Sequence, residues 1–243
     1  RSAEAFRGIP DIKEILVAVK PEEKPVFDEV LSRFLQSGEI PVTVIPSGGE
    51  TRQKTVEQSL SYLSGEVKYL AIHDGARPLV RKEDVEKTFA ACRTVGGAVL
   101  GVMAKDTVKI IRKDGLIDEN RRILSTPDRS TLFTAQTPQA FKLSEYRAAL
   151  ETAKQEHFDF TDDAQLFERT RRKVAAVIGH YDNIKITTPE DIKIAESLLQ
   201  QMENRVLHAL LDGRPVFLNL PAVKICAVVR QHYCNIFHHF SYF

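Results

Sequence analysis

The sequence predicts an α/β fold built on a Rossmann-like, mostly parallel sheet with helices on both faces. Short apolar runs rich in β-branched residues alternate with amphipathic helical stretches along the chain, and such alternation is typical of parallel sheets. Short polar signatures follow several of the apolar runs. Because ligands bind beyond the carboxyl ends of strands in open α/β sheets, we expect these signatures to form the rim of one site.

The first half of the chain carries this alternation most regularly. Strands are expected at residues 14–19, 42–45, 67–72 and 98–102. The helices between them are expected from Pro21 to about Leu35, after Gly48-Gly49 to about Leu63, and over residues 82–92. Pro21 favours a helix start because its fixed φ angle suits the first turn.

The alternation breaks at about residues 107–141, which are expected to form an extended β-arm. Lys113-Asp114-Gly115 is a turn signal between two β-rich runs, residues 108–111 and 116–117. An arm of this kind often contacts another subunit. The alternation then resumes with a helix at residues 144–155, strands at 174–178 and 184–187, and a final helix that starts at Thr188-Pro189.

The composition argues against several classes of function. A net charge of +1 argues against a nucleic-acid binder, which normally carries a basic stripe. No apolar run approaches the roughly 20 residues that a membrane-spanning helix needs. Cys92, Cys226 and Cys234 show neither metal-binding spacing nor a disulfide framework, so a reducing, cytoplasmic location is expected. The G-x-G-x-x-G pattern of dinucleotide oxidoreductases is absent from the sequence.

The strongest candidate for a metal or phosphate site follows the third expected strand. Asp74 ends an apolar run and precedes Gly75, whose missing side chain lets the backbone approach a ligand. A single carboxylate there suits Mg²⁺, which binds through one or two carboxylates and substrate phosphate oxygens; a turn-capping Asp is the alternative. Arg77 is placed to hold a phosphate or an Asp side chain, or else forms a surface salt bridge.

A second candidate phosphate site opens the helix after Gly48-Gly49. Arg52 and Thr55 follow these glycines, so cationic and hydroxyl donors meet a helix N-terminus, which favours bound phosphate. The pattern differs from the P-loop, and an ordinary strand–helix turn is the alternative.

Hydroxyl and cationic side chains elsewhere complete the candidate set. Thr107, Thr137 and Thr161 stand at expected element ends, where they either bind a phosphate or polyol or cap helices. Arg129 lies in the arm and would complete a partner's site if the arm crosses to another subunit. Lys185 lies in an expected strand, where it either neutralises a transferring phosphate or protects a sheet edge.

Taken together, these signatures resemble the methylerythritol-phosphate cytidylyltransferase family of the non-mevalonate isoprenoid pathway. The similarity runs in order over about residues 1–203. Its motifs are Gly48-Gly49-Glu50-Thr51-Arg52, His73-Asp74-Gly75-Ala76-Arg77-Pro78, Lys105-Asp106-Thr107, Gln136-Thr137-Pro138-Gln139-Ala140-Phe141, Thr161-Asp162-Asp163 and Asn183-Ile184-Lys185-Ile186-Thr187-Thr188-Pro189-Glu190-Asp191.

The resemblance implies a Rossmann-like homodimer, joined through the β-arm, that uses Mg²⁺ to transfer CMP from CTP to methylerythritol phosphate and releases pyrophosphate. The catalytic residues that it implies are Lys185, Asp74 and Arg77, with Asp74 as the metal ligand. Nucleotide contacts are implied for Gly48, Gly49, Thr55, Asp74 and Gly75. Contacts to methylerythritol phosphate are implied for Thr107, Thr137, Thr161, Lys185 and, from the partner chain, Arg129.

Both ends of the chain depart from the family pattern. The family opens with a strand, central in the sheet, and a Gly-rich triphosphate loop that this sequence lacks, so we expect the natural start to lie upstream and this exact chain to turn over slowly. After the cytidylyltransferase domain at 1–204, the tail at 205–243 resembles the opening of methylerythritol cyclodiphosphate synthase and is interpreted as the stub of a bifunctional enzyme. His208 matches a metal ligand there, but Val206 replaces the neighbouring Asp, so no zinc site is expected.

Two other functions stay open at this point. A pentitol-phosphate cytidylyltransferase is the related alternative, although Gly75-Ala76-Arg77 and Asp128-Arg129 favour the methylerythritol enzyme. A non-catalytic dimeric remnant of the fold is the other alternative, and the missing triphosphate loop is the feature that favours it.

Overall fold

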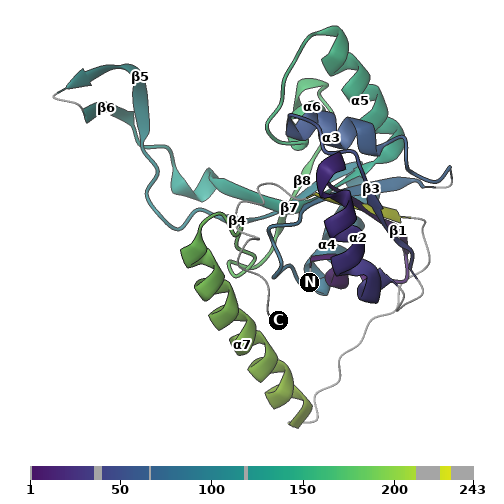
Figure 1. Cartoon of the computed structure of the whole chain (residues 1–243). Coiled ribbons are helices and arrows are strands. Elements are labelled where there is room, and N and C mark those ends of the chain that lie inside the picture. Colours follow the sequence, from purple (N-terminus) through teal and green to yellow (C-terminus); the bar gives the residue numbers. More distant parts are fainter. Residues whose placement is uncertain (1, 36–39, 66, 118–119, 212–224, 231–243) are drawn as a thin grey trace.

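The computed structural model describes residues 2–35, 40–65, 67–117, 120–211 and 225–230, and it has the predicted α/β architecture (Figure 1). Seven strands form the central sheet in the order β2-β1-β9-β3-β7-β4-β8. They are β1 Ile12–Ala18, β2 Val42–Ile45, β3 Tyr69–Asp74, β4 Gly97–Met103, β7 Phe133–Lys142, β8 Ala175–Ile178 and β9 Ile225–Arg230. The sheet is mostly parallel, as expected, because only β7 runs antiparallel to its neighbours.

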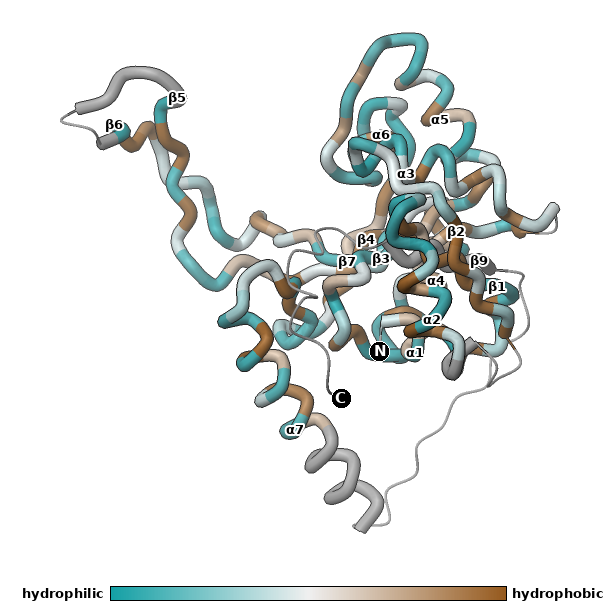
Figure 2. Tube along the Cα trace, viewed as in Figure 1, coloured by the Kyte–Doolittle hydropathy of each residue, from teal (hydrophilic) through white to brown (hydrophobic). Residues whose placement is uncertain are grey.

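Helices cover both faces of the sheet and build a separate hydrophobic core on each. One core involves α1 (Ser2–Arg7), α2 (Lys24–Leu35) and α4 (Lys82–Val95); the other involves α3 (Arg52–Ser59), α5 (Leu143–Gln155) and α6 (Ala164–Arg169). In β1, Ile15 belongs to the first core and Leu16 to the second, because successive side chains of a strand point to opposite faces. Hydrophobic residues therefore gather along the strands between the helical layers (Figure 2).

The last helix, α7 (Pro189–Leu211), extends away from the sheet (Figure 1). It begins at the predicted Thr188-Pro189 signature, where the Asp191 carboxylate accepts hydrogen bonds from the backbone N–H groups of Thr187 and Thr188, both at 2.8 Å. The helix continues without interruption across the expected domain boundary at residues 204 and 205. None of the described helices is long and apolar enough to cross a membrane.

The centre of the sheet is filled by a strand from the tail. Strand β9 lies between β1 and β3 and runs parallel to both, with Arg230 in register with Ala18 on one side and Asp74 on the other. The family resemblance implies a central strand contributed from upstream, whereas here residues 225–230 of the expected second-domain stub take a central place. Cys234 and the remainder of the tail at 212–224 and 231–243 lie outside the described residues.

The predicted β-arm is present but is shorter than expected. It consists of β5 (Ile110–Ile117) and β6 (Asn120–Ser125), which form a separate antiparallel pair. The turn predicted at Lys113-Asp114-Gly115 is wrong because these residues lie within β5. The register with β6 shifts between Ile111 and Leu116, and an irregularity of this kind accommodates a glycine within a strand. The later part of the expected arm instead forms β7 in the central sheet.

The strand predicted at residues 184–187 is also wrong. These residues form a loop between β8 and α7, and the Ile186 N–H donates 2.8 Å to the Ala76 carbonyl after the end of β3. Helix α3 ends at Ser59 rather than near Leu63, and the short helix α6 was not predicted. The other expected strands and helices are present, with ends that differ by a few residues.

Candidate active site

Asp74 forms the centre of the candidate site at the carboxyl end of β3. Its side chain is 13% exposed, and its Oδ2 lies 3.1 Å from Lys185 Nζ and 3.7 Å from Arg77 Nε. Burial disfavours the charged carboxylate, but Lys185 and Arg52 outweigh that effect and lower the pKa of Asp74. The carboxylate is therefore ionised at neutral pH, as both a metal ligand and a partner for cations require.

A chain of buried hydrogen bonds through Thr137 and His73 holds the Asp74 backbone. The Asp74 N–H donates 3.0 Å to Thr137 Oγ1, and the Thr137 hydroxyl donates 2.9 Å to His73 Nδ1. Burial lowers the pKa of His73 to about 4, so the imidazole is neutral and its Nε2–H donates 3.1 Å to the Arg77 carbonyl. Thr137 is itself buried, and in this structure its hydroxyl supports Asp74 instead of facing the solvent.

The loop after β8 brings Lys185 to Asp74. Its anchor is Asn183, a fully buried residue whose side-chain amide donates 3.1 Å to Gln136 Oε1 and 3.0 Å to the Thr137 carbonyl. Arg77 Nη1 in turn donates 2.7 Å to the Asn183 carbonyl. Gln136 and Asn183 both lie within the motifs of the sequence, but their anchoring role depends on long-range contacts that no local pattern predicts.

The two glycines before α3 are needed for close backbone approach. The Gly48 N–H donates 2.7 Å to the Val19 carbonyl, and a Cβ atom at Gly48 would lie 2.6 Å from the backbone nitrogen of Lys20. The Gly49 N–H donates 3.0 Å to Thr55 Oγ1, and the buried Thr55 hydroxyl donates 3.0 Å to the Thr51 carbonyl. Thr55 thus shapes this loop from within.

A buried ion pair ties the start of α3 to the start of α6. Arg52 pairs with Asp163, which is fully buried and also accepts a 2.7 Å hydrogen bond from the Tyr146 hydroxyl. Burial raises the pKa of Asp163, although Arg52 opposes the shift. Because the charge of Arg52 also acts on Asp74, this pair belongs to the electrostatic surroundings of the site. Arg52 was predicted to meet a phosphate, and here its guanidinium pairs with Asp163, a residue for which the sequence analysis predicted no role.

Thr107, Arg129 and Thr161, which were predicted to contact substrate, are more exposed than the residues around Asp74. Thr107 is exposed near the base of the arm, and Arg129, also exposed, donates 2.9 Å to the Lys105 carbonyl. Lys105 Nζ lies 3.4 Å from the ring centre of Tyr181, in the loop that carries Lys185. Thr161 is exposed before α6 and bonds with Gln165. Among the described residues, none of these three hydrogen-bonds to Asp74, Arg77 or Lys185.

The geometry thus brings Asp74, Gly75, Arg77, Thr137 and Lys185 together at one edge of the sheet. The family model for 2-C-methyl-D-erythritol 4-phosphate cytidylyltransferase matches residues 1–201. The chain belongs to this family. The nucleotidyltransferase class predicted from the sequence is therefore confirmed, and the family is an enzyme of isoprenoid biosynthesis.

Individual relatives agree with this assignment. The 2-C-methyl-D-erythritol 4-phosphate cytidylyltransferase of Geobacter metallireducens is 40% identical over 205 residues, which cover 83% of this chain and 84% of the relative. The enzyme of the same name from Caldanaerobacter subterraneus subsp. tengcongensis is 42% identical over 201 residues, or 82% and 85% of the two chains. The crystal structure of 4-diphosphocytidyl-2C-methyl-D-erythritol synthase from Anaerococcus prevotii superposes with a TM-score of 0.71 at 33% identity, covering 82% of this chain and 84% of that one.

Proposed function

We propose that this cytidylyltransferase transfers CMP from CTP to methylerythritol phosphate. A phosphate oxygen of the polyol phosphate forms a bond to the α-phosphorus of CTP, and the bond from that phosphorus to the pyrophosphate oxygen breaks. The reaction needs positioning and charge stabilisation more than covalent help from the protein. The observation that supports it most is the buried Asp74 carboxylate, held between Lys185 and Arg77 at the carboxyl edge of β3.

Each candidate residue receives a role in this reaction. Lys185 and Arg77 would offset the negative charge that develops on the phosphoryl oxygens. The backbone around Gly48, Gly49 and Gly75 would approach the nucleotide, with Thr55 shaping the first of these loops. Thr107, Thr161 and Arg129 would contact the polyol phosphate. Thr137 would act through the Asp74 backbone, because its hydroxyl already accepts one hydrogen bond and donates another.

Asp74 also fits the proposed Mg²⁺. Lys185 and Arg77 contact its Oδ2, and Oδ1 has no hydrogen bond or ion pair among the described residues. An ionised carboxylate with one free oxygen suits a metal that takes one protein carboxylate and completes its shell with phosphate oxygens and water. Bound there, Mg²⁺ would neutralise negative charge on the CTP phosphates.

The arm supports a homodimer. Ile110 and Ile111 on β5 are each 48% exposed, and Ile123 and Leu124 on β6 are each 56% exposed; hydrophobic stretches are visible on the arm in Figure 2. An exposed apolar surface of this kind is usually covered by another molecule, and a second copy is the simplest choice because most oligomers are symmetric. Arg129, near the base of the arm, would then reach the partner's site.

The cysteine chemistry supports the cytoplasm as the proposed compartment. Cys92 is a free, buried thiol in α4. Burial raises its pKa to about 12, so the thiol stays protonated and unreactive. Free thiols are the rule in reducing compartments, and cell fractionation would check this proposal.

Pyrophosphate release tests the proposed function directly. We expect release from CTP only when methylerythritol phosphate and Mg²⁺ are both present, and loss of release when EDTA is added. Ribitol phosphate is the matched alternative acceptor, and a preference for it would identify a pentitol-phosphate enzyme instead. If the chain is folded but releases no pyrophosphate with either acceptor, that result would support the non-catalytic remnant.

A further inference from the structure

Two segments, residues 74–84 and 180–186, are joined by contacts whose order is antiparallel from Ala76 onward. Asp74 contacts Lys185, Ala76 contacts Ile186, Arg77 contacts Asn183, Arg81 contacts Asp182 and Asp84 contacts His180. We call this set of contacts the loop clamp. The loop clamp runs from the contact between Asp74 and Lys185, at the reacting centre, to the contact between Asp84 and His180, at the first turn of α4.

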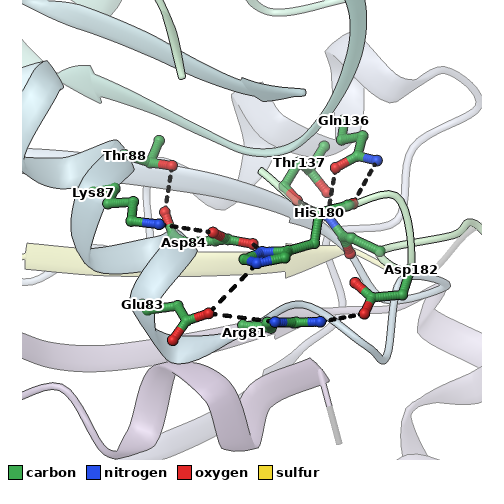
Figure 3. Close-up of polar contacts among 10 residues, drawn as sticks. Arg81, Glu83, Asp84, Lys87, Thr88, Gln136, Thr137, His180 and Asp182 are labelled. Carbon is green, nitrogen blue, oxygen red and sulfur yellow. Dashed lines mark hydrogen bonds and ion pairs between the residues drawn. The ribbon is translucent and has the colours of Figure 1, made fainter. Parts of the chain in front are cut away.

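The far end of the loop clamp is the pair formed by Asp84 and His180 (Figure 3). His180 Nδ1 lies 2.7 Å from Asp84 Oδ2, and the Asp84 side chain is fully buried. A buried carboxylate is costly unless it is paired, so this contact is strongly favoured in the folded chain. Gln136 Nε2 also donates 3.3 Å to the His180 carbonyl, which connects the same residue to β7.

Asp84 is itself a rigid anchor. It lies in the first turn of α4, where its N–H donates 3.1 Å to the Arg81 carbonyl and its own carbonyl accepts 2.7 Å from the Thr88 hydroxyl. A carboxylate in the first turn is favoured by the positive end of the helix. Lys185, in contrast, has a flexible side chain that is 36% exposed, so its position depends on how firmly the loop backbone is held.

Resting on the proposed function, we propose that Asp84 and His180 are positioning residues that hold Lys185 at the reacting centre. Neither touches Asp74. They fix the start of the loop against α4, while Arg81 and Asp182 fix its middle (Figure 3). Loosening the far end lets the Lys185 ammonium move away from the phosphoryl group, and a displacement of about 1 Å can cost up to about a hundredfold in rate.

A metal site is the other use that this cluster suggests. Glu83, Asp84 and His180 offer ligand atoms that lie within 4.8 Å of one another. Two cations already occupy these carboxylates, because Arg81 lies 3.5 Å from Glu83 and Lys87 lies 3.7 Å from Asp84. The charges are thus balanced by protein groups, which favours a structural clamp over a bound ion.

The test compares His180→Ala with His180→Asn, whose amide nitrogen takes a position close to that of Nδ1. In steady-state assays we expect His180→Ala to lower kcat about tenfold while KM for CTP stays within about twofold, because Lys185 acts on the transition state. His180→Asn should recover most of kcat. Combining Asp84→Ala with His180→Ala should cost no more than either alone, since the two act as one pair.

Hydrogen exchange provides a readout that does not depend on activity. The loop at residues 181–187 should exchange faster in His180→Ala than in the unsubstituted chain. Lys154→Ala is the control, because it removes an exposed ion pair with Glu57 on the other face of the molecule. It should change neither kcat nor exchange in this loop.

Three results would overturn the inference. The first is an unchanged kcat in His180→Ala, and the second is unchanged exchange in its loop. The third is activation or stabilisation by Zn²⁺ that disappears in His180→Ala, which would reveal a metal site instead. If the unsubstituted chain transfers no CMP at all, the proposed function fails, and the exchange measurement still decides whether Asp84 and His180 hold the loop.

Discussion

The buried centre around Asp74 and the exposed base of the arm differ in how much of their geometry this chain provides by itself. At the centre, His73, Thr137 and Asn183 are buried and hydrogen-bonded before any ligand arrives. At the arm base, Thr107 and Arg129 are exposed, and Arg129 contacts the chain through the Lys105 carbonyl.

This contrast separates two kinds of contribution to an enzyme. A preorganised charge costs no reorganisation when the transition state forms, so the centre should govern kcat. An exposed side chain becomes ordered only when its ligand or partner binds, so the arm base should govern KM and depend on the second subunit.

Removal of β9 should abolish the fold that supports the centre. Among the described strands, β9 alone joins β1 to β3, and its backbone pairs with six residues of β3. A chain that ends at Leu211 should lose its cooperative unfolding transition, as followed by circular dichroism. A transition with unchanged midpoint in that shorter chain would show that β9 has no role in holding the sheet together.

Asp163→Ala should destabilise the protein by about 3–5 kcal/mol, because it leaves the buried Arg52 guanidinium without its partner. Tyr146→Phe removes only the hydrogen bond to Asp163 and should cost about 1–2 kcal/mol. Urea unfolding measures both values. Equal effects from the two substitutions would mean that the ion pair contributes nothing beyond the hydroxyl contact.

Acid should destabilise the protein through His73. The pKa of His73 is lowered from 6.5 to about 4 in the folded state, so the unfolded chain binds more protons between these values. This contribution to stability is complete above about pH 6.5 and falls by about 3 kcal/mol as the pH drops to about 4. The free energy of unfolding should lose most of this dependence in His73→Gln, and an identical pH profile in that variant would contradict the assignment.

Mixed dimers should test whether Arg129 serves the partner's site. At low methylerythritol phosphate, Lys185→Ala and Arg129→Ala chains should each be impaired. Random mixing then places both native groups together in about a quarter of the sites, so activity should rise toward about a quarter of the unsubstituted level. No gain on mixing, with dimers confirmed by light scattering, would mean that Arg129 acts within its own subunit or not at all.

The sequence predicted the strand–helix order and the position of Asp74 because both depend on local patterns. It placed Lys185 in a strand because Ile184-Lys185-Ile186-Thr187 alternates in polarity, yet Ile186 bonds to the Ala76 carbonyl and the segment stays a loop. Strand β7 falls within the range predicted for the arm but joins the central sheet, and Pro138 weakens its local strand signal.

The remaining differences come from contacts between distant parts of the chain. The run at residues 225–230 is apolar enough for a strand, but its place between β1 and β3 is set by partners about 150 or more positions earlier. The resemblance implies that Thr137 binds substrate, whereas the hydrogen bonds of its hydroxyl join it to Asp74 and His73, which lie 63 and 64 positions away. Element patterns are therefore readable from the sequence, whereas the direction of a buried polar group is not.

The most direct test of this contrast measures kcat and KM for Lys185→Ala and Arg129→Ala side by side, with Mg²⁺ and saturating CTP. We expect Lys185→Ala to lower kcat about a hundredfold or more, as the loss of a preorganised charge usually does. Arg129→Ala should instead raise KM for methylerythritol phosphate about tenfold and leave kcat nearly unchanged. Equal changes in the same parameter for both variants would contradict the division between a preorganised centre and a rim that a ligand or partner completes.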